Sequence, residues 1–227
     1  MTVQSQAAAI LIPAYNAEAS LVELVQRLRK VMGERDIVVV DDGSTDDTGA
    51  VAASLGAVVL RHEKNRGKGA ALQTGFHYLH NQSDADFVLT IDADLQHQPE
   101  EIPKFLLAQQ QTNADIVVGW RQRTGTTMPV HRRISNTLTS FLVGRRTGML
   151  IKDSQCGFRL IRRAVLDHIS LDTSGYEAET EFLIKAARSG CTIEFVPVQT
   201  IYGREKSHMT HWSTTVNFIR VLLRKYA

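Results

Sequence analysis

The chain has 227 residues, of which 43% are hydrophobic and 22% are charged, and its formal net charge is +2. This composition is typical of a globular domain, and so small a net charge gives no support to nucleic-acid binding. Because the sequence has no run of about 18 apolar residues, it predicts no membrane-spanning helix. Residues 1–9 lack the basic start and apolar core of a signal peptide. Cys156 and Cys191 are too few for a thiolate metal site and favour free thiols in a reducing cytosol over a disulfide.

Short apolar strands alternate with helical segments along the chain. The sequence predicts strands over 8–12, 37–40, 58–60, 87–91 and 116–118, with Pro13 ending the first strand. It predicts helices around 21–31, 45–55, 69–80 and 99–111, and a last amphipathic helix over 212–226. Such alternation is typical of an α/β fold with a parallel sheet covered by helices on both faces. We expect one domain over residues 1–227, with a basic, partly helical segment over 121–150 before the chain returns to the core.

The most informative feature is the acid pair Asp92-Ala93-Asp94, which follows the predicted strand over 87–91. The carboxyl end of a strand is where open α/β sheets bind ligands, and alternating strand faces let Asp92 and Asp94 point the same way. Two neighbouring carboxylates repel each other unless a cation joins them, and a divalent ion can also bind diphosphate oxygens. The pair therefore favours a metal-bridged nucleoside diphosphate, most often a nucleotide sugar; the alternative is a turn or a helix cap.

Two further predicted strands end in residues suited to a nucleoside. Tyr15 offers a ring for stacking on a base, and Asp41 or Asp42 can accept hydrogen bonds from base N–H groups or ribose hydroxyls. Each alone could be an ordinary loop residue, but in a parallel sheet these ends share one edge with the acid pair and can line one crevice. The small residues of 65–71 lead into a helix, where a backbone can approach a nucleotide closely. The spacing there is not that of a P-loop, and the absence of a Gly-x-Gly-x-x-Gly motif counts against a dinucleotide oxidoreductase.

Five motifs follow one another along the chain: Pro13-Ala-Tyr-Asn16, Val39-Val-Asp-Asp-Gly-Ser44, Asn65-Arg-Gly-Lys-Gly69, Asp92-Ala-Asp-Leu-Gln-His97 and Asp153-Ser-Gln-Cys-Gly-Phe-Arg159. In this order they resemble family 2 glycosyltransferases, above all the dolichol-phosphate mannose synthases and related bacterial polyprenyl-phosphate sugar transferases. The resemblance covers essentially the whole chain. It implies a GT-A fold with a mostly parallel sheet, a nucleoside-diphosphate sugar as donor, a divalent metal (Mg²⁺ or Mn²⁺) and inversion at the anomeric carbon.

The resemblance also implies roles for particular residues. It assigns donor binding to Pro13, Tyr15, Asp41, Asp42, Lys68, Asp92 and Ala93. Asp94 and Gln96 would ligate the metal, and Arg159 would lie near the junction of donor and acceptor. The family usually has Glu where Ala17 stands, so Glu18 is expected to take over that contact. Near the C-terminus, Arg204, Lys206 and His208 resemble the family's element for the donor diphosphate.

The basic segment suits an anionic acceptor. Arg121, Arg132 and Arg133, with Ser135 beside them, could clamp a phosphate by forked hydrogen bonds. The alternative is a solvated charged loop. If the acceptor is a hydroxyl instead, Glu179 and Glu181 are the candidate bases, although acids at a helix start need no chemistry to explain them.

Two apolar stripes with helical spacing suggest contact with a membrane surface. One comprises Trp212, Val216, Ile219, Leu223 and Tyr226, and the other comprises Ile134, Leu138, Phe141 and Leu142. The alternatives for each stripe are packing on the core and insertion into the bilayer interface. A polyprenyl-phosphate acceptor would require such a contact, which favours a peripheral protein on the cytoplasmic face of the membrane.

The first hypothesis is therefore a metal-dependent, inverting transferase that moves a hexose from GDP-mannose or UDP-glucose to a polyprenyl or dolichyl phosphate. The runner-up is an enzyme of the same fold that acts on a hydroxyl of a saccharide or a protein. A sugar nucleotidyltransferase would need a Gly-rich, basic loop directly after the first strand, and Pro13-Ala14-Tyr15 is not one. A non-catalytic nucleotide-sugar binding module is a further alternative that no residue favours.

Overall fold

Among residues 7–122, 130–201, 211–224 and 226, which the computed structural model describes, seven strands form one sheet in the order β3-β2-β1-β4-β6-β5-β7. The strands are β1 (Ala8–Ala14), β2 (Ile37–Asp41), β3 (Val58–Arg61), β4 (Phe87–Thr90), β5 (Ile116–Arg121), β6 (Arg159–Arg162) and β7 (Ile193–Val198). Strand β6 runs antiparallel to its neighbours β4 and β5, whereas every other pair is parallel. The predicted α/β fold with a mostly parallel sheet is confirmed.

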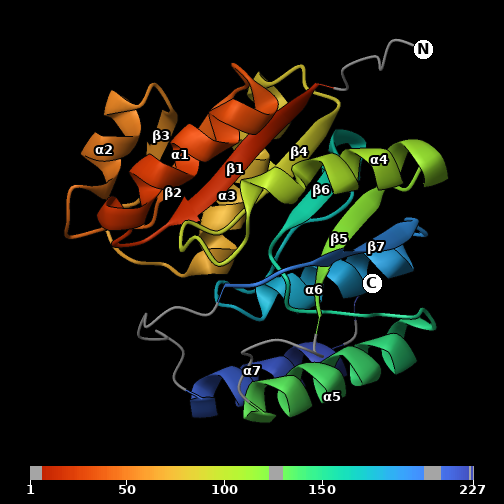
Figure 1. The fold of residues 1–227 in the computed structure, drawn as a ribbon. Coiled ribbons are helices and arrows are strands. Elements are labelled where there is room, and N and C mark those ends of the chain that lie inside the picture. Colours follow the sequence, from red (N-terminus) through yellow and green to blue (C-terminus); the bar gives the residue numbers. More distant parts are fainter. Residues whose placement is uncertain (1–6, 123–129, 202–210, 225, 227) are drawn as a thin grey trace.

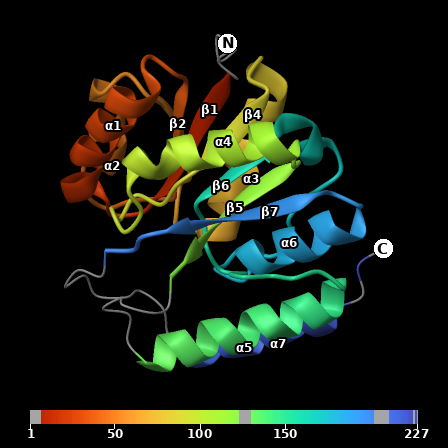
Figure 2. The ribbon, with the colours of Figure 1, turned by 45° about the vertical axis from the view of Figure 1, so that its right-hand side comes forward.

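Helices cover both faces of this sheet. They are α1 (Glu18–Met32), α2 (Thr48–Ser54), α3 (Lys68–Gln82), α4 (Ile102–Thr112), α5 (Val130–Thr147), α6 (Ala178–Arg188) and α7 (His211–Leu223), with short 3₁₀ turns η1 (Pro99–Glu101) and η2 (Arg163–Asp167). In Figure 1, α1 and α4 lie in front of the sheet and α3 lies behind it. Helices α5 and α7 lie side by side beyond α6, as Figures 1 and 2 both show.

The strands at the centre of the sheet are apolar because both of their faces are covered. Leu11 and Val39 are fully buried in β1 and β2, as is Leu89 in β4. Helix α1 places Leu24 and Leu28 on the core because residues four apart share a helix face. Such burial of continuous apolar runs is what made these strands recognisable in the sequence.

The expected end of the first strand is wrong. Strand β1 continues through Pro13, which pairs with Val40 of β2 in parallel register. A proline has no N–H to donate, but its fixed φ lies close to the extended range, and here it stands one residue from the strand end. The register of β1 with β4 ends at Leu11, so the proline lies beyond that pairing, where its missing N–H is tolerated.

Helix α7 packs on the protein along one face, and its insertion into a bilayer interface remains a prediction. Phe218, Val221 and the following Tyr226 are buried, and the Tyr226 hydroxyl donates to the backbone oxygen of Val221 at 3.2 Å. Ile219 and Leu223 are exposed. One face of the helix thus packs on the protein while another stays at the surface, and the helix ends at Leu223 rather than at 226.

Cys156 is buried and Cys191 is half-buried, and both are free thiols, as predicted. Within the described part of the chain, each helix is too short or too polar to cross a bilayer.

Candidate active site

One edge of the sheet collects the predicted site residues. The parallel register sets Ala14 beside Asp41, so the loops after β1 and β2 leave the same edge. Thr90, the last residue of β4, pairs with Arg159, the first residue of the reversed strand β6. The loop with the acid pair and the motif that ends in Arg159 therefore meet at this edge, as the argument from parallel strands required.

The loops after β1 and β2 are fastened to each other. Asn16 has a positive φ of 50°, its N–H donates to Ser44 Oγ at 3.0 Å, and its side-chain oxygen accepts from the Thr45 N–H at 2.9 Å. The carboxylate of Glu18 accepts from the Asp47 N–H at 3.2 Å. The predicted donor contact of Glu18 remains a prediction, because in this structure its carboxylate joins the two loops. Tyr15 is 38% exposed beside them, as a ring that stacks on a base must be.

Asp41 and Asp42 are buried and already hydrogen-bonded within the protein. Asp42 accepts from His62 Nδ1 at 2.6 Å and from the backbone N–H groups of Arg66 and Gly67 at 2.9 and 2.7 Å. Asp41 accepts from the Ser44 N–H at 2.9 Å. These carboxylates shape the loops of the crevice, and their predicted contacts with a nucleoside remain predictions.

The N-terminus of α3 is occupied by the protein itself. The backbone oxygen of Ser174 accepts from the N–H groups of Gly69 and Ala70 at 2.7 and 3.3 Å. A Cβ at Gly69 would lie 2.5 Å from the backbone oxygen of Thr173. The small residues here therefore admit the loop over 172–177 rather than a nucleotide, which differs from the close approach expected of them.

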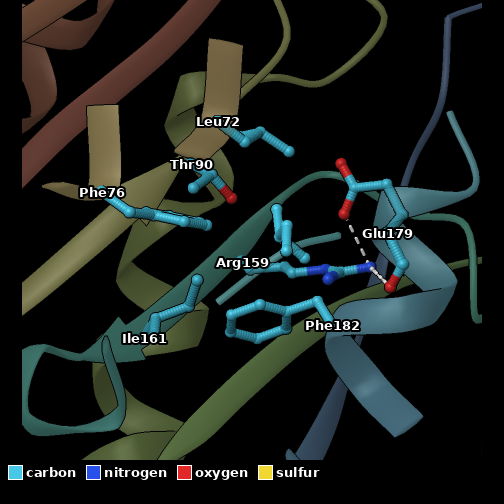
Figure 3. Close-up of a pocket in the computed structure, with 8 residues that line it drawn as sticks. Leu72, Phe76, Thr90, Arg159, Ile161, Glu179 and Phe182 are labelled. Carbon is cyan, nitrogen blue, oxygen red and sulfur yellow. Dashed lines mark hydrogen bonds and ion pairs between the residues drawn. The ribbon is translucent and has the colours of Figure 1, made fainter. Parts of the chain in front are cut away.

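Four charged side chains form a chain of ion pairs that begins at Asp92 of the acid pair and leads into the core. Lys68 Nζ lies 2.6 Å from Asp92 Oδ1 and 3.0 Å from Glu179 Oε1. Glu179 Oε2 in turn accepts from Arg159 Nη2 at 2.7 Å, and Figure 3 shows Arg159 reaching from β6 across the ring of Phe182 toward Glu179. We call Asp92, Lys68, Glu179 and Arg159 the charge chain.

Burial disfavours the charged forms of Lys68 and Asp92 in the charge chain, but the ion pairs favour these charged forms more strongly. Burial lowers the pKa of Lys68, yet the nearby carboxylates of Asp92 and Glu179 hold that pKa above its ordinary value. Burial likewise raises the pKa of Asp92, and the Lys68 ammonium holds it below its ordinary value instead. Arg159 is 2% exposed and lies at the buried end of the charge chain, and its expected place near the donor–acceptor junction remains a prediction.

Asp94, the second residue of the acid pair, and Gln96 are both half-buried in the loop after β4. Asp94 Oδ1 accepts from the Gln96 N–H at 3.0 Å, across Leu95 with its φ of 58°. No group of three or more acidic, histidine or cysteine side chains gathers as a metal site among the described residues. Asp94 and Gln96 can still supply carboxylate and amide oxygens, the donor types that Mg²⁺ accepts alongside water and substrate phosphate. They fit a metal that the diphosphate helps to hold.

Arg121 is clamped at the end of β5. Its Nε and Nη2 donate to the two oxygens of Asp153 at 2.8 and 2.9 Å. Burial raises the pKa of Asp153, but the Arg121 guanidinium holds it below its ordinary value. On α5, Arg133 Nε is buried and has no hydrogen-bond partner among the described residues, whereas Ser135 is exposed. Arg132 belongs to α5, but its side chain lies outside the described part.

The two candidate bases are too buried to meet a hydroxyl acceptor in this structure. Glu181 is fully buried and accepts from the backbone N–H groups of Asp172 and Thr173 at 3.0 and 2.9 Å. Lys185 Nζ lies 2.9 Å from Glu181 Oε1. Glu179 is held by Lys68 and by Arg159 in the charge chain. Both acids are thus paired within the protein, and their role as bases for a hydroxyl acceptor remains a prediction.

Tyr176 is a site residue that the sequence reasoning missed. It is 42% exposed, and it lies close enough to Lys68, Asp92 and Asp94 for their charges to act on its hydroxyl. Burial raises the pKa of Tyr176; Lys68 lowers it and the two carboxylates raise it further. Its position beside Gly175 gave no signal in the sequence, because the loop meets the acid pair only in the folded chain.

The chain that follows β7 is bonded to the loop after the acid pair. The Ile201 N–H donates to the backbone oxygen of Gln96 at 3.0 Å, and the Gln199 N–H donates to Glu101 Oε2 at 3.0 Å. The chain therefore leaves β7 along the loop that follows Asp94. Arg204, Lys206 and His208 lie outside the described residues.

Comparison with known proteins agrees with this architecture. The family model described as Glycosyl transferase family 2 matches residues 9–170. An undecaprenyl-phosphate mannosyltransferase of Micrococcus luteus is 34% identical over 206 residues, which cover 86% of this chain and 83% of that protein. A UDP-N-acetylglucosamine–dolichyl-phosphate N-acetylglucosaminyltransferase of Methanococcus voltae is 31% identical over 215 residues, 85% of either chain.

Among solved structures, glucosyl-3-phosphoglycerate synthase of Mycobacterium tuberculosis has the same fold. That structure, which contains Mn²⁺, UDP and glucosyl-3-phosphoglycerate, superposes with a TM-score of 0.75 at 23% identity. The match covers 96% of this chain and 79% of the other. The protein described here is therefore a glycosyltransferase with the GT-A fold. It belongs to glycosyl transferase family 2, and its relatives include polyprenyl-phosphate sugar transferases.

Proposed function

We propose that this enzyme transfers a hexose, with inversion, from a nucleoside-diphosphate sugar to a polyprenyl phosphate at the cytoplasmic face of a membrane. The observation that carries the proposal is the meeting of two sets of side chains at one sheet edge. The acid pair faces the crevice there, and the clamped Arg121 stands at the end of β5. A diphosphate and a second phosphate can thus be held within one site.

The donor side rests on Tyr15, the acid pair and the loop over 95–101. Tyr15 would stack on the base, and Asp92 would accept from a hydroxyl of the ribose or the sugar through the part of its carboxylate that Lys68 leaves exposed. Asp94 and Gln96 would hold a divalent ion, which when bound neutralises charge on the leaving diphosphate. The chain that continues from Ile201 would bring Arg204, Lys206 and His208 toward the same diphosphate.

The acceptor side needs positive charge and no base. A phosphate monoester is already anionic at neutral pH, so it needs positioning rather than deprotonation. Arg121 is oriented by Asp153, and Arg133 has a buried Nε without a described partner. The burial of Glu179 and Glu181 agrees with a reaction that uses no general base, and so favours a phosphate acceptor over a hydroxyl.

The lipid part of the acceptor would be met by α5 and α7. Ile134, Leu138 and Phe141 recur along α5 at helical spacing and are 63, 55 and 60% exposed. Ile219 and Leu223 are exposed on α7, which lies beside α5 in Figures 1 and 2. Large exposed apolar side chains together with surface arginines are typical of helices that lie in a bilayer interface.

Transfer to a defined lipid tests the proposal. Purified protein is incubated with vesicles that contain a short-chain polyprenyl phosphate, with GDP-mannose or UDP-glucose, and with Mg²⁺, Mn²⁺ or a chelator. We expect a polyprenyl-phosphate hexose that forms only with a metal present, and mannose is the first sugar to try because of the Micrococcus luteus relative. Transfer to a soluble saccharide but never to the lipid would overturn the acceptor assignment.

A further inference from the structure

The charge chain links the Gly-Phe-Arg element to the acid pair without any exposed intermediary. Lys68 Nζ stands between Asp92 Oδ1 at 2.6 Å and Glu179 Oε1 at 3.0 Å, and Arg159 Nη2 lies 2.7 Å from Glu179 Oε2. Only Asp92 is appreciably exposed, with 26% of its side chain accessible, against 14% for Lys68 and 4% or less for the other two. The chain thus has one end at the crevice and the other in the core.

The buried end is fixed in place. Arg159 Nε donates to the backbone oxygen of Cys156 at 2.8 Å, and Nη2 donates to the backbone oxygen of Glu179 at 3.0 Å. In Figure 3, Leu72, Phe76, Ile161 and Phe182 line the narrow space next to Arg159. This space is too narrow to admit water, so no solvent can replace a lost partner there.

Gly157 is shaped by the same cluster. A Cβ at this position would lie 2.7 Å from Lys68 Nζ, 2.9 Å from Glu179 Oε1 and 3.1 Å from Asp92 Oδ2. Its backbone oxygen accepts from Thr90 Oγ1 at 2.6 Å, which holds the motif against the end of β4. A side chain at this position would therefore displace the ends of the ion-paired side chains.

We infer that Lys68, Glu179 and Arg159 are positioning residues, which act on the donor by fixing the carboxylate of Asp92. This inference rests on the proposed function, in which Asp92 contacts the donor. Alternating charges let each buried group neutralise the next, so Asp92 is kept in one orientation by a rigid support.

The test separates positioning from folding by two substitutions and their combination. Lys68→Met leaves Asp92 without its counter-charge, while Arg159 remains the partner of Glu179, and is expected to destabilise the fold. Lys68→Met with Glu179→Gln returns the summed charge of the cluster to zero, with Asp92 and Arg159 left, and should regain part of the lost thermal stability while Asp92 stays unsupported. For this double variant we expect kcat/KM for the donor to fall about 100-fold, as misplacement by an ångström can cause. The KM for polyprenyl phosphate should not change.

Coupling to Asp92 gives the decisive readout. If Lys68 acts through Asp92, adding Lys68→Met and Glu179→Gln to Asp92→Asn should lower kcat/KM little further. Lys68→Arg, which restores the cation, should recover part of the activity. Gly157→Ala, which pushes on the ion pairs without changing charge, should lose activity while the fold is kept. Additive losses in the Asp92→Asn background, or an unimpaired Gly157→Ala enzyme, would overturn the inference.

Lys185 of α6 provides a matched control for Lys68, because it is also a lysine paired with a buried glutamate. Lys185 pairs with the buried Glu181 at 2.9 Å but faces the loop over 170–173 rather than the acid pair. Lys185→Met should lower the melting temperature and leave kcat/KM for the donor unchanged. The positioning role is tested separately by calorimetry without acceptor. The affinity for GDP-mannose or UDP-glucose, whichever the wild type binds, is measured for each variant. Failure of the proposed lipid acceptor would leave that measurement valid, so the two failures are distinguishable.

Discussion

Arg121 and Asp153 form a two-point ion pair, with Nε and Nη2 of the arginine donating to the two carboxylate oxygens at 2.8 and 2.9 Å. The Arg121 backbone N–H adds a third contact to Asp153 at 3.2 Å. Asp153 is 1% exposed, and its carboxylate orients this guanidinium while also accepting from the Gln155 N–H at 3.1 Å. The first residue of the motif over 153–159 thus fixes a cation at the end of β5, while its last residue, Arg159, belongs to the charge chain.

Replacing Asp153 by Asn should show how much this pair contributes, and at which pH. Because Arg121 holds the folded-state pKa of Asp153 below its ordinary value, the pair stabilises the fold above about pH 4, the unfolded pKa of an aspartate. That stability is lost as pH falls through the lower folded-state pKa. At pH 7 we expect a loss of about 3 kcal/mol in the free energy of unfolding.

Urea unfolding of wild type and Asp153→Asn between pH 7 and pH 2.5 checks this expectation. The difference between the two proteins should shrink below pH 4. A difference that stays constant over the whole range would mean that the charge of Asp153 is unimportant.

Arg133→Ala tests the acceptor site. Since its buried Nε has no described partner, we expect the arginine to bind the acceptor phosphate, and its loss to raise the KM for polyprenyl phosphate about 10- to 100-fold. Calorimetric donor affinity should be unchanged. Arg145→Ala, an exposed arginine on the same helix, is the matched control and should behave as wild type. If both substitutions raised the KM equally, Arg133 would contribute only general positive charge and would not bind the acceptor phosphate specifically.

Asp94→Ala and metal removal should give one and the same defect. Asp94 supplies the carboxylate of the proposed metal site, so its loss should lower kcat about 10³-fold or more while the protein stays folded. In the wild type, a chelator should do the same and added Mg²⁺ or Mn²⁺ should reverse it. Turnover of the Asp94→Ala protein at a rate that still depends on metal would place the ion elsewhere.

The strands and the grouping of the motifs could be predicted because both depend on local pattern. Continuous apolar runs identified β1, β2 and β4, and the rule that parallel strands share a carboxyl edge brought Asp41, Asp92 and Tyr15 together. Strand β6 escaped prediction because Arg159 and Arg162 stand at its two ends, so a four-residue strand carries only two apolar residues.

What could not be predicted was which partner each charge would take. The resemblance assigns Lys68 to the donor, whereas in the structure Lys68 pairs with Asp92 and with Glu179, which comes from a helix far along the sequence. The sequence makes Glu181 a candidate base but does not reveal that its carboxylate accepts hydrogen bonds from the N–H groups of Asp172 and Thr173. Such pairings form only when elements distant in the sequence pack together, so the periodicity and spacing of the sequence do not predict them.

The exposed apolar side chains of α5 should determine binding to membranes. Leu138→Glu combined with Phe141→Glu removes two large exposed apolar groups from one helix and adds charge that anionic lipids repel. We expect vesicle binding in a flotation assay to weaken about tenfold or more, since a buried Leu or Phe contributes roughly 1.5–3 kcal/mol. Transfer to a water-soluble, short-chain acceptor phosphate should continue.

Leu107→Glu is the control for that experiment. Leu107 is 54% exposed on α4, which Figures 1 and 2 show on the opposite side of the sheet from α5 and α7. Its substitution should leave vesicle binding at the wild-type level, because only the face formed by α5 and α7 would meet the lipid. If the α5 variant floats with vesicles as well as the Leu107 variant does, the membrane is not reached through these helices, and the exposed row on α5 needs another explanation.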